Sequence, residues 1–141
     1  MAVAVLALLG LLVSTYLLLF KLGVLGSIAC GGSGSCERVA NSSWAVFLGI
    51  PVAAYGVAGY LVLLVVALAG LGERLLARPE PTRLLAVLSG LGVAFAVYLT
   101  YLELAVIHAV CRWCVVSAVL ITAICAASLA GLRAFRTDRA R

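Results

Sequence analysis

Two pairs of cysteines at short spacing are the residues of this chain best suited to chemistry. Cys30 and Cys36 lie six positions apart, and Cys111 and Cys114 form a Cys-x2-Cys pair. A thiolate that attacks a disulfide breaks the old bond as it forms a new one, so two electrons pass from one pair to the next. The two pairs together therefore predict an electron relay.

The Cys-x2-Cys pair lies where a third apolar segment gives way to a fourth. Residues three apart share a helical face, and a thiolate at a helix N-terminus is stabilised by unpaired amides and the helix dipole. Arg112 adds positive charge nearby. We expect a sulfur with a lowered pKa, suited to exchange; a structural disulfide or half of a metal site is the alternative.

The spacer between Cys30 and Cys36 is rich in glycine, with Gly31, Gly32 and Gly34 among its five residues. Glycine adopts backbone angles that other residues resist and leaves a chain mobile. We expect this segment to present a disulfide and to move.

The elements that must position these cysteines are membrane helices. The chain is 66% hydrophobic and only 11% charged, with a mean hydropathy of +1.27, far from soluble averages. A helix crosses the hydrocarbon with roughly 20 apolar residues, whereas a β-barrel would show short alternating strands. We predict a single-domain, all-α integral membrane four-helix bundle, with spans at about 1–20, 50–71, 84–107 and 115–132.

The longest polar connection covers residues 21–49, between the first two spans. Glu37 to Leu48 has a weakly amphipathic pattern that predicts a short helix at the membrane surface. Trp44 fits there because indole favours the headgroup layer. Pro51 is acceptable in the first turn of the second span.

Basic residues predict the orientation, because short cytoplasmic loops carry the excess of Lys and Arg. The connections predicted to lie on the non-cytoplasmic side carry only Lys21, Arg38 and Arg112. We therefore expect a multi-pass plasma-membrane protein with cytoplasmic termini and with both cysteine pairs outside, where disulfides persist. The net charge of +5 indicates topology and no nucleic-acid partner. The arginines that mark the cytoplasmic face are Arg74, Arg78, Arg83, Arg133, Arg136, Arg139 and Arg141.

Three other interpretations stay open. The first span could be a signal peptide cleaved before Cys30, although no basic residue precedes its long apolar run. The four cysteines could bind zinc, although the glycine-rich spacer lacks the rigidity that a metal site favours. The chain could also be a non-enzymatic scaffold with two structural disulfides.

Cys125 is the unpaired fifth cysteine. It follows Cys114 by eleven residues, which at 1.5 Å per residue is about 16 Å deeper in the bilayer. We therefore expect it to act as a small apolar side chain.

These residues resemble the bacterial homologues of vitamin K epoxide reductase, from Cys30 to Cys114 and through the helix that follows. The two cysteine spacings, with a serine six positions after Cys36, are more specific than a lone Cys-x2-Cys. The other matching motifs are Val39-Ala40-Asn41-Ser42-Ser43-Trp44, Gly49-Ile50-Pro51 with Tyr55-Gly56, and Tyr98-Leu99-Thr100-Tyr101-Leu102-Glu103-Leu104.

The resemblance implies a quinone-linked thiol-disulfide oxidoreductase. A reduced thioredoxin-fold protein would attack Cys30, Cys36 would attack Cys111, and Cys114 would pass two electrons to menaquinone or ubiquinone. Some bacterial members carry a fused thioredoxin-like domain that is not found in this sequence. A separate extracytoplasmic partner, which in turn oxidises exported proteins, is therefore implied.

The candidates for the quinone site are Ser42, Phe47, Trp113 and Glu103. The resemblance gives Ser42 a place near the reacting atoms, where its hydroxyl can bind a quinone oxygen or a cysteine sulfur. Phe47 and Trp113 could line a flat-ring pocket together with Phe95, Tyr98 and Tyr101, although aromatic residues at this spacing also serve as packing.

Glu103 and His108 are the ionisable residues near the outer end of the third span. A carboxyl inside a membrane suggests function, so Glu103 either delivers protons to the reduced quinone or makes a helix contact. His108 has a suitable intrinsic pKa for proton transfer, but it is also compatible with a simple interfacial position.

Overall fold

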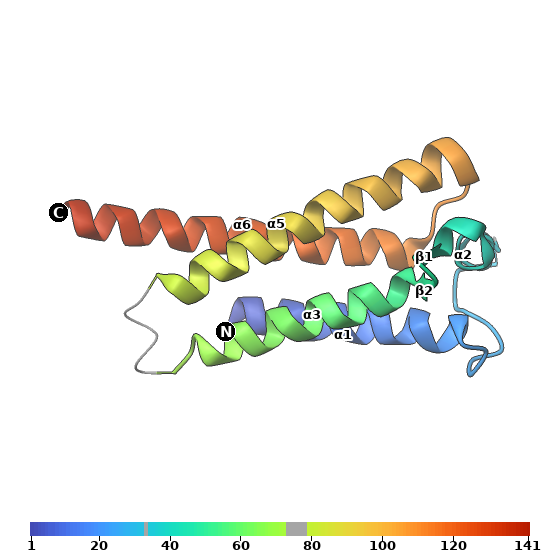
Figure 1. Ribbon diagram of the computed structural model, residues 1–141, viewed down its shortest axis with the longest axis horizontal. Helices are drawn as coiled ribbons and strands as arrows, with labels where there is room; N and C mark the ends of the chain where they lie inside the picture. Colours follow the sequence, from blue (N-terminus) through green and yellow to red (C-terminus); the bar gives the residue numbers. More distant parts are fainter. Residues whose placement is uncertain (33, 73–78) are drawn as a thin grey trace.

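Four long helices form the body of the protein in the computed structural model, which describes residues 1–32, 34–72 and 79–141. They run alternately up and down the bundle (Figure 1). Each is long and apolar enough to cross a membrane, which confirms the predicted all-α membrane bundle. The helices are α1 (Ala2–Lys21), α3 (Val52–Ala69), α5 (Glu80–Tyr101) and α6 (Arg112–Ala140).

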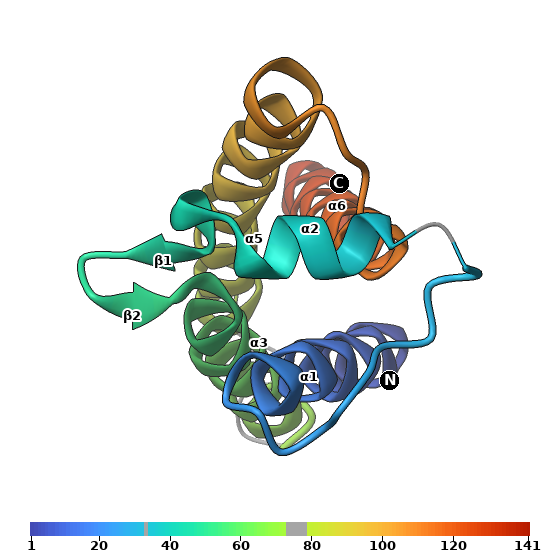
Figure 2. The same ribbon diagram turned by 90° about the vertical axis from the view of Figure 1, so that its right-hand side faces the viewer.

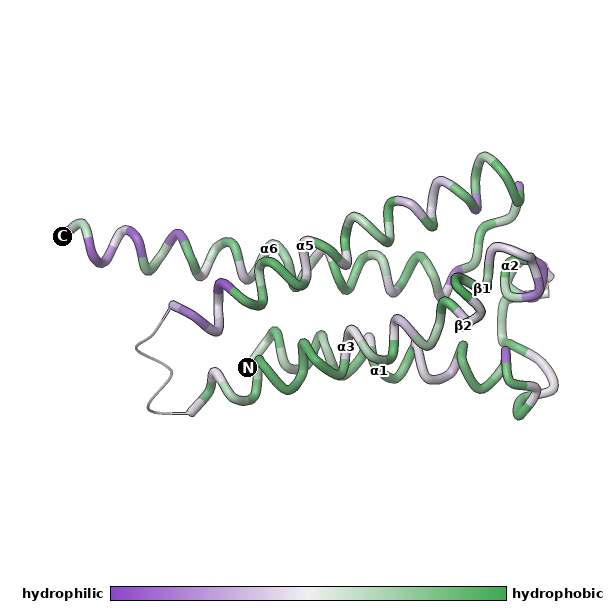
Figure 3. The backbone as a smooth tube through the Cα atoms, viewed as in Figure 1, coloured by the Kyte–Doolittle hydropathy of each residue, from purple (hydrophilic) through white to green (hydrophobic). Residues whose placement is uncertain are grey.

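The last two spans, Glu80–Ile107 and Arg112–Ala140, are longer than predicted. α5 begins at Glu80 rather than Leu84, with a proline in its first turn, and α6 begins at Arg112 and continues past residue 132 to Ala140. Hydropathy detects only the part of a helix that fits the hydrocarbon, so polar turns beyond it were missed. Figure 3 shows the hydrophilic end of α6 and the hydrophilic start of α5. Arg74 and Arg78 lie outside the described residues.

Small residues bring the helices close together. α1 packs against α3 and α6, α5 packs against α6, and α3 packs against α5. Gly10 of α1 faces the Tyr60 ring of α3, and a Cβ on Gly56 of α3 would come within 2.7 Å of the Ser14 hydroxyl of α1. Such close approach provides the van der Waals contact that holds helices together in lipid. The main buried core comprises Ala7, Tyr60, Leu63, Ala67, Leu85, Ile121 and Ile124.

The connection between α1 and α3 covers one end of the bundle. The predicted surface helix is present as α2 (Ser35–Asn41), which lies across this end (Figure 2), but it stops well before Leu48. The predicted helical extent was therefore wrong beyond Asn41. After α2 come the 3-10 turn η1 (Ser43–Ala45) and two short strands, β1 (Val46–Phe47) and β2 (Ile50–Pro51).

A tight turn explains why the helix does not continue. β1 and β2 pair antiparallel, with Phe47 opposite Ile50. The two intervening residues, Leu48 and Gly49, have φ values of 53° and 80°. Positive φ at both central positions is the requirement of a type I′ turn, one of the two common two-residue hairpin turns. The hairpin delivers the chain to Pro51, the residue before α3.

We predict that Gly10→Ala destabilises the bundle, because the added methyl group would overlap the Tyr60 ring. Overpacking of this kind costs about 1–3 kcal/mol. Thermal unfolding in detergent measures the change. Gly59→Ala is the matched control on α3, where a Cβ meets no other atom within 4 Å. Equal melting temperatures for the two variants would contradict the packing described here.

Candidate redox site

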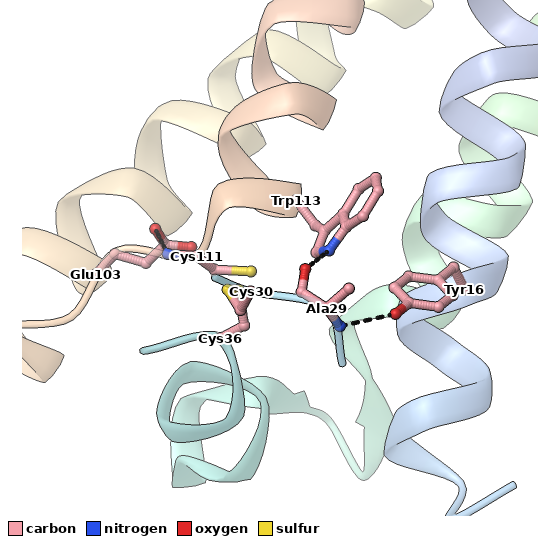
Figure 4. The surroundings of a disulfide bond; sticks show 7 residues. All are labelled: Tyr16, Ala29, Cys30, Cys36, Glu103, Cys111 and Trp113. Atoms are coloured by element: carbon pink, nitrogen blue, oxygen red, sulfur yellow. Dashed lines mark hydrogen bonds between the residues drawn. A yellow bond between two sulfur atoms is a disulfide. The ribbon is translucent and has the colours of Figure 1, made fainter. Parts of the chain in front are cut away.

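The structure brings both predicted cysteine pairs to the same end of the bundle. Cys30 and Cys36 are joined by a disulfide, with their Cα atoms 6.0 Å apart. Cys30, Cys36 and Cys111 are buried in one cluster, against which Cys114 packs. Figure 4 shows the Cys111 sulfur directed toward the disulfide. The sulfurs of two distant segments are thus placed for exchange.

The start of α6 determines the setting of the second pair. Cys111 is the residue before the helix, and its carbonyl accepts the Val115 N–H at 3.0 Å. Cys114 therefore lies in the first turn, and both cysteines are free thiols. A hydrogen bond from the Cys114 thiol lowers the pKa of Cys111, and it outweighs the opposing effects of burial and of the Glu103 carboxylate. The sequence predicted a lowered pKa for a sulfur of this pair without specifying which one.

Glu103 lies directly behind this pair. It belongs to a π-helical segment, η2 (Leu102–Ile107), which continues α5, and its side chain is only 4% exposed. Its Oε2 accepts the Cys111 N–H at 3.2 Å, and its carboxyl also makes a hydrogen bond with the Cys114 side chain. Single π-helical turns frequently occur at functional sites. The carboxyl is thus in direct contact with the thiol pair.

The chain reverses direction sharply between Glu103 and Cys111. The Ala109 N–H donates to the Glu103 carbonyl at 3.1 Å. His108 adopts the left-handed conformation, with φ of 54°, which closes the end of η2. His108 is exposed, and its Nδ1 lies 3.2 Å from the Val106 carbonyl oxygen. His108 therefore ends the η2 segment.

An apolar cavity of about 420 Å³ extends from the thiol pair into the bundle between the four long helices. Its volume falls within the range of small-molecule pockets. Cys111, Cys114 and Glu103 line its outer end, and Lys21 lines it from α1. The Lys21 ammonium donates to the Ala40 carbonyl at 2.7 Å and so links α1 to α2. The cavity offers a flat apolar molecule contact with two thiols and a carboxyl.

Three predicted pocket residues lie elsewhere in the described part of the chain, outside the lining of this cavity. The Ser42 hydroxyl donates to the Val39 carbonyl at 2.7 Å. Phe47 lines a second hollow of about 280 Å³ beside the hairpin. The Trp113 indole N–H donates to the Ala29 carbonyl at 3.0 Å. Whether they also contact a quinone stays a prediction.

Of the other aromatic candidates, Phe95 lines both hollows and Tyr98 lines the second. Tyr101 is exposed on α5. Sequence reasoning missed Tyr55, whose hydroxyl donates to the Phe47 carbonyl at 3.1 Å and whose ring lies 6.3 Å from that of Phe95. Its signal in the sequence was the Tyr55-Gly56 motif, since an apolar segment by itself does not distinguish such a ring from ordinary packing.

The structure also bears on the zinc interpretation. Cys30 and Cys36 are bonded to each other, so two of the four thiolates that a zinc site would need are in a disulfide. Within the ranges that the structure describes, no group of three or more His, Cys, Asp or Glu side chains is arranged to bind a metal ion.

A helical membrane bundle that holds a disulfide against a Cys-x2-Cys pair defines a membrane disulfide oxidoreductase. Residues 1–129 match the model of the Vitamin K epoxide reductase family, so the chain belongs to this family. The match includes the first span, which the motifs between Cys30 and Cys114 did not cover.

We predict that Cys114→Ala raises the pKa of Cys111, because the thiolate loses its hydrogen-bond donor. The alkylation rate of Cys111 as a function of pH, followed by peptide mass spectrometry with Cys30 and Cys36 replaced by serine, reports this pKa. The midpoint should move upward in Cys114→Ala and less in Cys114→Ser, which keeps a donor. An unchanged or lower midpoint in the alanine variant would refute the assignment.

Proposed function

We propose that this protein oxidises a reduced extracytoplasmic thioredoxin-fold protein and passes the two electrons to a membrane quinone. One observation carries the proposal: the Cys30–Cys36 disulfide is buried against Cys111, at the outer end of an apolar cavity. This arrangement connects an outer thiol donor to an acceptor dissolved in lipid. Membership of the family supports the same direction of transfer.

The exchange begins at the loop disulfide. A thiolate of the partner attacks Cys30, the disulfide breaks, and Cys36 leaves as a thiolate. Cys36 then attacks Cys111 of the oxidised Cys111–Cys114 pair, and Cys114 leaves as a thiolate. The second thiol of the partner releases Cys30, which attacks Cys36 and frees Cys111. The partner becomes a disulfide, the loop disulfide is restored, and the inner pair is reduced.

The reduced pair then gives up two electrons and two protons as the Cys111–Cys114 disulfide forms again. A quinone takes both and becomes a quinol, so electrons and protons balance. The cavity suits this acceptor because its lining is largely apolar and meets both thiols at one end. Menaquinone and ubiquinone share the required ring chemistry.

Glu103 accounts for the protons in this scheme. Its carboxyl touches both the Cys111 amide and the Cys114 side chain, and it faces the cavity. It can accept the proton of Cys114 and deliver it to a quinone oxygen. We keep Ser42, Phe47 and Trp113 as predicted quinone contacts of this chain.

We propose a plasma-membrane location with the cysteines outside and both termini in the cytoplasm. Both termini lie toward the end of the bundle away from the cysteines (Figure 1). Arg133, Arg136 and Arg139 belong to the C-terminal part of α6, whose hydrophilic end lies there too (Figure 3), as expected for a cytoplasmic face. The loop disulfide would then face the compartment in which disulfides persist.

We predict that replacing both Cys30 and Cys114 with alanine, with added quinone as the two-electron oxidant, traps a Cys36–Cys111 disulfide, because neither residue is left to resolve it. Non-reducing peptide mass spectrometry detects the bond. A scaffold with purely structural disulfides would leave Cys36 and Cys111 as separate thiols in this variant.

Anaerobic quinone reduction by a reduced thioredoxin-fold donor, in detergent or lipid, tests the whole reaction. Each alanine variant of the four paired cysteines should lose turnover. Cys125→Ala should keep it, since Cys125 lies deeper in α6 and away from the paired sulfurs. Turnover that survives the loss of Cys111 or Cys114 would exclude the proposed route.

We predict that Glu103→Gln slows quinone reduction on the order of 10²-fold, the lower range for loss of a positioned acid or base. Glutamine keeps an oxygen that can accept the Cys111 N–H, so thiol exchange between the two pairs should stay close to normal. Stopped-flow quinol formation and the rate of Cys36–Cys111 exchange separate the two effects. Equal losses in both rates would assign Glu103 a structural role instead.

A further inference from the structure

Ala29, the residue before Cys30, is bound by side chains from two different helices. Its N–H donates to the Tyr16 hydroxyl of α1 at 3.0 Å, and its carbonyl accepts the Trp113 indole N–H of α6 at 3.0 Å (Figure 4). Both backbone polar groups of one loop residue are therefore bound to side chains. This arrangement fixes the peptide on the N-terminal side of the disulfide.

The two side chains also support each other. The rings of Tyr16 and Trp113 lie 5.2 Å apart at a tilt of 60°, a favourable geometry for an aromatic pair. Both rings pack against the buried cysteine cluster. We call Tyr16, Trp113 and Ala29 the latch.

The other side of Cys30 touches the same helix. Gly31 has φ of 72°, and a Cβ placed on it would lie 3.0 Å from the Arg112 guanidinium. Arg112 and Trp113 are the two residues between Cys111 and Cys114. The spacer of the Cys-x2-Cys pair thus contacts the residues on both sides of Cys30.

We propose that Tyr16 and Trp113 are positioning residues that hold the Cys30–Cys36 disulfide against Cys111, and that the latch must open before a partner can reach Cys30. This inference rests on the proposed function. Cys36 is 0% exposed and Cys30 is 6% exposed, so a partner thiolate cannot approach either sulfur while the loop is docked.

The latch is suited to opening because Ala29 itself is exposed. Water can replace both hydrogen bonds when the loop leaves, so no buried polar group is left without a partner. The docked loop serves the exchange between Cys36 and Cys111, and the released loop serves the exchange with the partner. Weakening the latch should therefore have opposite effects on these two steps.

Phenylalanine variants test the inference. Tyr16→Phe removes only the hydroxyl that accepts the Ala29 N–H. Trp113→Phe removes the indole N–H donor and leaves a smaller aromatic ring. In protein with Cys111 and Cys114 replaced by alanine, a water-soluble phosphine reduces the Cys30–Cys36 disulfide without partner or quinone. We expect Trp113→Phe and Tyr16→Phe each to speed this reduction about threefold, the effect of one exposed hydrogen bond. With all cysteines present, the Cys36–Cys111 exchange should slow by a similar factor.

Trp44→Phe and Tyr101→Phe are the matched controls, since these side chains are 49% and 63% exposed and lie outside the latch. Their phosphine rates should equal that of the parent protein. Unchanged or slower reduction in both latch variants, or equal acceleration in the controls, would overturn the inference. Failure of the unmodified protein to reduce quinone would instead remove the proposed function and leave the phosphine result intact.

Discussion

The contact between the loop disulfide and the N-terminus of α6 is the interaction on which the rest of the structure depends. It joins residues some 80 positions apart, so every other element must bring them to the same place. α2 lies across the end of the bundle and buries Cys36 there. The π-helical turn and His108 return the chain sharply enough for the Cys111 N–H to reach the Glu103 carboxyl. Both devices thus position the two cysteine pairs at the same end of the bundle.

The membrane explains why these devices lie at the end of the bundle. Within the hydrocarbon, backbone groups must pair inside their own helices, so irregular segments are confined to the surface or to protected positions. Within the bundle, small residues such as Gly10 and Gly56 allow α1 and α3 to pack closely against each other. The cysteines placed at this end of the bundle lie beside the connecting loop and line the end of an apolar cavity, as the proposed exchange requires.

Much of this fold could be predicted from sequence because hydropathy is averaged over whole segments of about 20 residues. The four spans and the meeting of two cysteine pairs followed from apolar length, charge and spacing. The end of α2 did not, since the weak helical pattern up to Leu48 carries no information about a hairpin. That hairpin depends on positive φ at Leu48 and Gly49. Of these two residues, only the glycine indicates a turn in the sequence, because glycine adopts positive φ readily.

The site was harder to predict because its details depend on side-chain direction. Trp113 looked like a pocket residue, yet its indole N–H points to Ala29, which lies 84 positions earlier in the chain. Tyr16 lies in a run of apolar residues, where it resembles any interfacial aromatic. Glu103 was recognisable because a carboxyl in a span is rare, but its contact with the Cys111 amide requires a turn that spacing cannot indicate.

The bond from Lys21 to the Ala40 carbonyl has a mechanical consequence. It couples the end of α1 to α2, the helix that carries Cys36. A change in the tilt of α1 would therefore also move α2. Helix tilt responds to the match between hydrophobic length and bilayer thickness. The relative position of the two cysteine pairs should therefore depend on lipid chain length, and it should differ between thicker and thinner membranes.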